Sequence, residues 1–256
     1  MTPLLLVNRV SDTQWQAVDD AGRIAGHGDV TQRPDGRRYL SIDVWQDAAF
    51  TPLATAIATD LPAPLHTLVG ESEAGPDSRW QQAGYAFSRR EWEYLLPTAA
   101  AATGSAPVLP PGVTIVPGTE ADDDALRALD RALREEIDRT TGWHTLPAEV
   151  APRPEGTVLG DPRRYAVAVA EDGTYLGLVR VAVVPRRARI GLLAVLAGSQ
   201  RRGVGRALLA HALGILQVEG FPSAWAEVDE SNRAAAALLD GFGAQRVGSV
   251  VELVRR

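Results

Sequence analysis

The sequence contains no cysteine, and all 26 of its Lys and Arg positions are arginine, so lysine is absent as well. Without cysteine the protein has no thiolate nucleophile, no zinc-thiolate site and no disulfide. Without lysine it has neither a Schiff-base lysine nor the phosphate-binding lysine of a nucleoside-triphosphate loop. We expect no metal site. The exclusive use of arginine indicates a GC-rich bacterial genome.

Long apolar runs are also missing. No stretch approaches the roughly 20 residues that a membrane helix needs, and the first ten residues have neither a basic leader nor a small-residue cleavage site. We therefore expect a soluble, cytoplasmic protein without a membrane partner. The formal charge is -6, with arginine and acidic residues intermingled, which does not favour a nucleic-acid partner.

One segment separates the chain into two parts. The stretch PTAAAATGSAPVLPPG, residues 97–112, contains small residues and prolines without a helical or alternating apolar period. Such a composition is typical of a linker between domains. The sequence therefore predicts one domain at 1–97, a linker at 98–112 and a second domain at 113–256.

The C-terminal domain alternates strand and helix patterns. We expect Thr119 to cap a first helix, because Leu126, Leu129, Leu133 and Ile137 follow at helical spacing. Residues 140–162 show only weak periodicity. The other expected helices lie at 205–219 and 232–239, and the expected strands lie at 113–116, 165–170, 175–184, 189–195, 225–228 and 245–254.

The N-terminal domain repeats part of this order. Its end, VGESEAGPDSRWQQAGYAFSRREWEYLLP, is similar to the end of the chain, AEVDESNRAAAALLDGFGAQRVGSVVELVRR. Both segments read as strand, helix, glycine-containing turn and strand. The sequence therefore predicts a duplicated α+β unit, in which each half is a twisted mixed sheet flanked by helices. Further strands are expected at 15–18, 24–30, 39–44 and 66–69, with a helical stretch at 53–60.

A glycine- and arginine-rich loop joins a buried strand to a helix. Glycines let backbone amides approach a ligand, and the helix N-terminus adds partial positive charge. The arginines add full positive charges, so the loop suits a diphosphate. Alone, it could also be a solvated turn. The residues that carry the pattern are Gln200, Arg201, Arg202, Gly203, Val204, Gly205 and Arg206.

A dinucleotide-binding fold would need a glycine triplet after the first strand of a βαβ unit, and that triplet is absent. The Gln-x-x-Gly-x-Gly pattern after Leu193, Ala194 and Val195 instead resembles the pyrophosphate loop of the GNAT (Gcn5-related N-acetyltransferase) superfamily. The resemblance covers roughly residues 113–256. It implies that residues 113–256 form a catalytic GNAT domain, with acetyl-coenzyme A bound at this loop and pantetheine paired with the backbone of residues 193–195. With the duplication, it also implies that residues 1–97 form a degenerate GNAT-like domain. It also implies a cofactor contact from Asn232.

Two positions depart from the family pattern. The family often has a tyrosine that protonates the leaving thiolate, and Leu239 occupies the matching position. A proline usual after Val195 is also missing, with Ala197 in its place. The first departure puts the leaving-group acid in question, whereas the cofactor loop is retained.

Two residues are candidates for deprotonating an acceptor. Glu227 is on the strand beside the expected cleft, where it could act as a general base or belong to a structural ion pair. His144 is the second candidate base. With Trp143 it could line an acceptor pocket, or it could be an exposed histidine beside a packed tryptophan. We treat His27, His66 and His211 as structural.

These features together predict direct transfer of an acetyl or other short acyl group from coenzyme A to a primary amine, on a small molecule or a protein N-terminus. The oxyanion would be stabilised by a backbone amide near Val195. Two alternatives stay open: a non-catalytic acyl-coenzyme A sensor or pseudoenzyme, and a structural partner protein. The protein could be a monomer or a homodimer.

Overall fold

The computed structural model describes residues 5–33, 36–75, 78–99, 109–140, 161–184 and 187–256. They form two compact units, Met1–Glu91 with Ser249–Arg256, and Trp92–Gly248. The strands follow the order β1-β2-β3-β4-β5-β12-β6-β11-β10-β9-β8-β7 in one 12-stranded sheet with parallel and antiparallel pairs. None of the described helices is long and apolar enough to span a bilayer.

The chain divides differently from a cut at the 98–112 linker, most of which lies outside the described residues. Strand β6 (Ala86–Pro97) begins in the first unit and ends in the second, whereas β12 (Gln245–Arg255) runs from the second unit into the first. Each unit therefore contains a strand segment from the other half of the sequence.

The first unit is a sheet covered on one face by helices. Trp15, Phe50, Leu53 and Ile57 form its core together with Val251 and other residues. The unit contains β1 (Leu6–Arg9), β2 (Gln14–Val18), β3 (Ile24–Gln32), β4 (Arg38–Val44), α1 (Phe50–Asp60), β5 (Leu65–Gly70) and α2 (Arg79–Gln82), with parts of β6 and β12.

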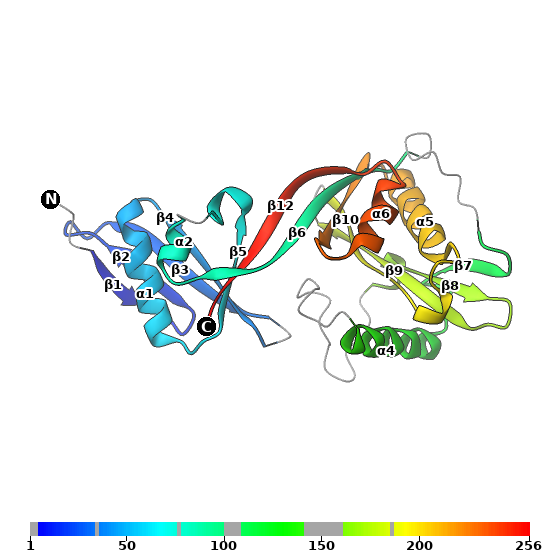
Figure 1. Ribbon diagram of the computed structural model, residues 1–256, viewed down its shortest axis with the longest axis horizontal. Coiled ribbons are helices and arrows are strands. Elements are labelled where there is room, and N and C mark those ends of the chain that lie inside the picture. The colour runs from blue at the N-terminus through cyan, green and yellow to red at the C-terminus, as the bar shows by residue number, and fades with distance from the viewer. Residues whose placement is uncertain (1–4, 34–35, 76–77, 100–108, 141–160, 185–186) are drawn as a thin grey trace. The chain divides into compact units, whose positions relative to one another are not determined.

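The second unit has helices on both faces of its sheet, with α5 and α4 on opposite sides in Figure 1. Apolar residues of α5 pack with one face, including Val179 and Ala226, and α4 packs on Val167 and Leu178. Its elements are β7 (Val113–Pro117), α4 (Asp123–Arg139), β8 (Tyr165–Ala170), β9 (Tyr175–Val184), β10 (Arg187–Val195), α5 (Val204–Val218), β11 (Ser223–Asp229) and α6 (Arg233–Asp240).

Helix α4 begins later than the sequence indicated. Asp122, not Thr119, is its N-cap, and the Asp122 carboxylate accepts a hydrogen bond from the amide of Ala125 at 2.8 Å. A turn closed by the amide of Glu120 and the carbonyl of Pro117 separates β7 from the helix. The expectation of a cap at Thr119 was wrong because this turn occupies the position.

The two units share a strand-helix-strand-helix-strand order. In the first, β4 pairs in parallel with β5, and Tyr39 lies opposite His66. In the second, β10 pairs in parallel with β11, and Arg189 lies opposite Trp225. A helix connects the two parallel strands in each case, α1 in the first unit and α5 in the second. This correspondence agrees with a duplicated unit.

Candidate cofactor and acceptor site

Strand β10 separates from its neighbour β11 at a β-bulge between Ile190 and Leu192. Before the bulge the two strands are paired, and the last pair is Arg189 opposite Trp225. Residues 192–195 remain paired with β9, but in the described part of the chain they have no ladder partner on β11. The edge of β10 that faces β11 therefore carries unpaired backbone groups after the bulge.

Backbone amides along this edge alternate in direction. The amide of Leu196 donates to a β9 carbonyl at 2.9 Å. Because successive amides of a strand in an antiparallel pair point to opposite sides, the amide of Ala194 also points to β9, whereas those of Leu193 and Val195 point to the gap. The carbonyl of Val195 accepts a hydrogen bond from Nε2 of Gln200 at 2.9 Å. Gln200 thus closes the loop on the end of the strand.

The loop between β10 and α5 has an unusual backbone. Arg201 has φ 61° and Gly203, the N-cap of α5, has φ 87°, both in the left-handed region. The first amide that donates within the helix is that of Ala207, to the carbonyl of Gly203 at 3.0 Å. In the described part of the chain the amides of Gly203, Val204 and Gly205, which precede it, donate no hydrogen bond. They form a concentration of free donors at a helix N-terminus.

Side chains around the loop divide between solvent and core. Arg201 and Arg202 are exposed and form no ion pair in the described ranges, so both charges are available to an anion. Val204 is buried in the core under α5. A Cβ on Gly205 would make ordinary contacts with neighbouring side chains. The Arg206 guanidinium lies 4.9 Å from the ring centroid of Phe242.

Helix α6 contains the two other positions that the family resemblance singled out. Asn232 is its N-cap, and Oδ1 accepts a hydrogen bond from the amide of Ala235 at 3.0 Å. This cap leaves the Nδ2 amide group of Asn232 as a donor at the exposed end of the helix. Leu239 is buried in the core of the second unit, where it supplies no acidic proton.

Glu227 is held by an arginine. On β11 Ala226 and Val228 point into the core under α5, so Glu227 lies on the opposite face, because side chains alternate along a strand. Its Oε2 accepts a hydrogen bond from Nε of Arg189 at 2.5 Å, and the side chains are 21% and 27% exposed respectively. The carboxylate is therefore held beside the diverging strands.

Three other residues considered in the sequence analysis are not placed beside Glu227. His144 and Trp143 lie outside the described residues. His211 lines a small pocket with Val179 and Val181 on the α5 face, away from Glu227. Burial lowers the pKa of His211, and its Nε2 has no hydrogen-bond partner among the described residues.

The sequence reasoning did not single out Arg180 and Gly191 as site residues. Gly191 lies on β10, next to the strand of Glu227, and Arg180 lies on β9, on the other side of β10. In the sequence, Arg180 interrupts the apolar run of β9 and Gly191 interrupts that of β10. These interruptions could have marked both positions. No group of metal-binding side chains occurs within the described ranges.

A family model named Acetyltransferase (GNAT) family matches residues 127–244, which include the bulged strand, the loop and Asn232. The C-terminal half belongs to the GNAT superfamily. A curated relative, the [ribosomal protein bS18]-alanine N-acetyltransferase of Escherichia coli K12, is 36% identical over 75 residues. That match covers 29% of this chain and 51% of the relative, so the chain spans about half the length of the curated relatives it matches.

Solved structures show a GNAT fold over the whole chain. A GCN5-related N-acetyltransferase from Sphaerobacter thermophilus has a TM-score of 0.68 at 20% identity, covering 96% of this chain and 81% of that one. A tandem GNAT protein from the clavulanic acid biosynthesis pathway has a TM-score of 0.62 at 15% identity, covering 99% and 84%. The architecture is thus that of tandem GNAT proteins.

The N-terminal unit has a different loop at the equivalent point. Asp47 follows β4 in a short 3-10 helix (Asp47–Ala49). In α1, which follows, Pro52 occupies the first turn and has no amide hydrogen to donate. This helix start combines a negative charge with a missing donor, whereas α5 combines free amides with arginines.

Proposed function

We propose that the protein is a cytoplasmic N-acetyltransferase that transfers an acetyl or other short acyl group from acyl-coenzyme A to a primary amine. The observation that carries this proposal is the loop before α5, next to the open edge of β10. Its backbone is left-handed at two positions, and its amides at the helix start and Arg201 and Arg202 have no partner among the described residues. A diphosphate is the ligand that such a set of donors fits best.

The second unit would hold the cofactor at two places. Amides of the loop, with Arg201 and Arg202, would bind the diphosphate, and Asn232 would donate from its free amide group. The gap-facing backbone of Leu193 and Val195 would pair with the pantetheine arm. Bound there, coenzyme A supplies the activated thioester. The Val195 amide would then donate to the oxygen of the reacting carbonyl.

Glu227 is the proposed proton acceptor. An alkylamine has a pKa near 10, so the acceptor must lose a proton before its nitrogen attacks the acyl carbon. Oε2 of Glu227 is bound by Arg189, which leaves Oε1 to accept that proton directly or through water. As the carbon–nitrogen bond forms and the carbon–sulfur bond breaks, the second proton lost from nitrogen balances the thiolate. The products are an N-acyl amine, coenzyme A and one proton. His144 stays the second candidate base.

The acceptor is a primary amine on a small molecule or a protein N-terminus. The relative's name specifies the alanine of a ribosomal protein, which supports an α-amine next to a carbonyl carbon. Antibiotics, polyamines and amino-acid derivatives remain possible acceptors of the same chemistry.

The proposal is tested by acetyl-coenzyme A binding followed by turnover. A ligand that binds only the folded state stabilises it by RT ln(1 + [L]/Kd), about 2.7 kcal/mol at a hundred times Kd. We expect a rise in Tm with acetyl-coenzyme A and thiol release with at least one member of an amine panel. The absence of a Tm shift at millimolar cofactor would contradict the proposal.

A second candidate is a non-catalytic acyl-coenzyme A sensor, with the same cofactor site. It is favoured by buried Leu239, which replaces the usual acid, and by the ion pair with Arg189, which gives Glu227 a structural partner. Cofactor binding without thiol release on any amine would support the sensor. The absence of cofactor binding would point to a structural partner protein.

A further inference from the structure

Arg180, which has no counterion among the described residues, lies beside the proposed acceptor site. The Nε atom of Arg180 is buried and has no hydrogen-bond partner in the described part of the chain, and the side chain forms no ion pair there. Arginine stays protonated at all physiological pH values. A partly buried guanidinium without a carboxylate costs free energy, and among the described residues the charge of Arg180 is unmatched.

Arg180 lies on the same side of the sheet as Glu227. On β9 it lies opposite Leu192 of β10, which packs on the α4 side of the sheet. Arg189 and Glu227 lie on this same side, since their neighbours along each strand point under α5. Arg180 and Glu227 therefore face the same space from the two strands that flank β10.

Gly191 leaves room for the guanidinium over β10. A Cβ built on Gly191 would lie 3.4 Å from Nε and 3.5 Å from an Nη atom of Arg180. The guanidinium thus extends across the bulge toward β11, where the pair formed by Arg189 and Glu227 lies. Neighbouring strands are about 4.8 Å apart, so one small ligand can span from the Arg180 guanidinium to Glu227.

A buried arginine of the first unit shows the usual arrangement. Arg89 donates to Glu252 at 2.7 Å and to Glu91 at 2.6 Å, so its charge is matched by two carboxylates. Arg180 has the same charge and no carboxylate among the described residues. The missing anion would be supplied by a ligand that also presents an amine to Glu227.

We propose that Arg180 binds the carboxylate of a small amino-acid acceptor, one in which a few bonds separate the amine from the carboxylate. This inference rests on the proposed function and narrows its substrate class. Guanidinium and carboxylate match in geometry and charge. A peptide N-terminus has an amide at that place and forms no ion pair with Arg180, so we expect free amino acids to be preferred over peptides.

The test compares matched substrates on the full chain. Initial rates are measured for small amino acids, for the amide of each one and for dipeptides, with saturating acetyl-coenzyme A. We expect Arg180→Gln to raise KM for the amino acids about 10- to 100-fold, with little change in kcat and little change for the amides. Arg180→Lys should recover part of the loss. Gly191→Ala places its Cβ in ordinary van der Waals contact with the guanidinium, so it should leave the same KM nearly unchanged.

Arg163→Gln is the matched control, because Arg163 is an exposed arginine of the same unit paired with Asp161. It should leave all rates unchanged. Equal losses on amino acids and their amides, or equal rates on both with wild type, would overturn the inference while leaving the proposed function intact. If no amine is acetylated, the proposed function fails. Calorimetry with an amino acid and coenzyme A then tests the carboxylate subsite at Arg180 independently of turnover. Binding to wild type but not to Arg180→Gln supports the subsite, and equal or absent binding refutes it.

Discussion

A single hydrogen bond defines the chemistry open to Glu227. The Arg189 guanidinium donates to Oε2 of Glu227, and this bond orients the carboxylate. The same bond also fits a purely structural role, in which the pair holds β10 and β11 together before they separate. The two roles differ in what removal of the charge does to rate and to stability.

We predict that Glu227→Gln lowers turnover by about 100- to 10,000-fold, the usual cost of losing a general base. The loss should shrink as pH rises, because more of the amine then arrives deprotonated. Cofactor binding should barely change. The measurement is a pH-rate profile with the Tm of the same preparation.

Glu219→Gln is a control for that prediction, since Glu219 is likewise bound by an arginine, Arg164, at 2.9 Å. It should keep the wild-type rate. If Glu227→Gln shows an unaltered profile with a lowered Tm, Glu227 is structural and the base is His144 or a water held by the backbone.

The backbone of Gly203 permits a second residue-level prediction. With φ 87° it adopts a conformation that costs a β-branched residue on the order of 1–3 kcal/mol. Gly203→Val should therefore rearrange the loop and abolish the Tm shift caused by acetyl-coenzyme A. Gly214→Val, on α5 where a Cβ meets open space, should leave the basal Tm unchanged or slightly raised, because valine has a higher helix propensity than glycine, and it should keep the shift. A retained shift in Gly203→Val would mean that the loop does not bind the cofactor.

At the level of elements, the sequence predicted what depends on local pattern. The helix after the loop and the strand before it followed from apolar spacing and glycine position, and α5 and β10 lie close to the expected ranges. The ion pair between Arg189 and Glu227 could not be derived, because it depends on the parallel register that places Arg189 opposite Trp225. Register between strands separated by a helix leaves no local signal.

The cofactor loop also shows where residue type and role diverge. Gln200 was expected as a cofactor ligand, but its side chain binds the carbonyl of Val195. Asn232 uses one of its two polar groups to cap α6. Both hydrogen bonds depend on where the chain returns in space. The family pattern therefore locates the loop. Which of its residues shape the loop, and which of them can contact a ligand, depends on the three-dimensional structure.

The loop in the N-terminal unit leads to a prediction about stoichiometry. Asp47 and Pro52 remove the charge and a donor that a diphosphate needs, so we expect one coenzyme A per chain by calorimetry. Replacing Arg201 and Arg202 together with glutamine should then remove most of the measurable binding. Residual tight binding in that variant, or two sites in wild type, would show that the first unit binds coenzyme A.

At the scale of the whole molecule, the exchange of strand segments makes the two halves of the sequence interdependent. Residues 249–256 belong to the first unit, and Val251 and Leu253 are fully buried in its core. A fragment of residues 1–97 therefore lacks a strand of its own unit and is unsuitable for testing that unit alone. Binding by the N-terminal unit has to be measured in the intact chain.

Truncation at residue 248 should accordingly destabilise the N-terminal unit, although the removed residues come last in the sequence. Loss of one large buried side chain costs about 2–5 kcal/mol, and the truncation removes at least two. Hydrogen exchange should show loss of protection in β5, which pairs with β12 from Leu65 to Gly70. Unchanged protection in β5 would mean that β12 is dispensable for the first unit.

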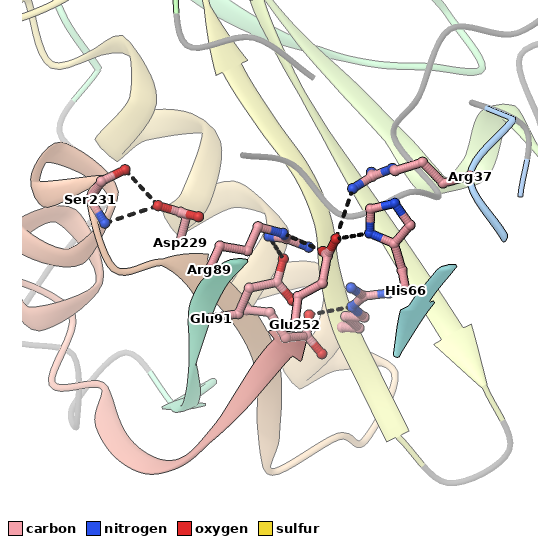
Figure 2. Close-up of polar contacts among 9 residues, drawn as sticks. Arg37, His66, Arg89, Glu91, Asp229, Ser231 and Glu252 are labelled. Atoms are coloured by element: carbon pink, nitrogen blue, oxygen red, sulfur yellow. Dashed lines mark hydrogen bonds and ion pairs between the residues drawn. The ribbon is translucent and has the colours of Figure 1, made fainter. Parts of the chain in front are cut away.

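Glu252 on β12 is the centre of a buried charge network in the first unit (Figure 2). Its Oε1 lies 2.8 Å from Nδ1 of His66 and 3.4 Å from an Nη atom of Arg37, and its Oε2 accepts from Arg89 at 2.7 Å. The side chain is 2% exposed. Burial acts to raise the pKa of Glu252, but His66, Arg89 and Arg37 outweigh it and lower that pKa to about 2.

This depression links the stability of the first unit to pH. The ordinary pKa of the group is 4.5, so its contribution is fully present above that value and is lost as pH falls toward 2. A shift of this size corresponds to about 3 kcal/mol. We predict that urea unfolding of wild type loses this amount between about pH 5 and pH 2, beyond the loss seen in Glu252→Gln. The variant should be less stable at pH 7, because Arg89 and Arg37 lose a buried partner, and its curve should approach that of wild type at pH 2.

Glu71→Gln is the control. It removes a more exposed carboxylate, which accepts a hydrogen bond from Ser249 at 2.8 Å, and it should leave the acid dependence nearly unchanged. Parallel curves for wild type and Glu252→Gln would show that the network does not hold the charge of Glu252 in the folded state.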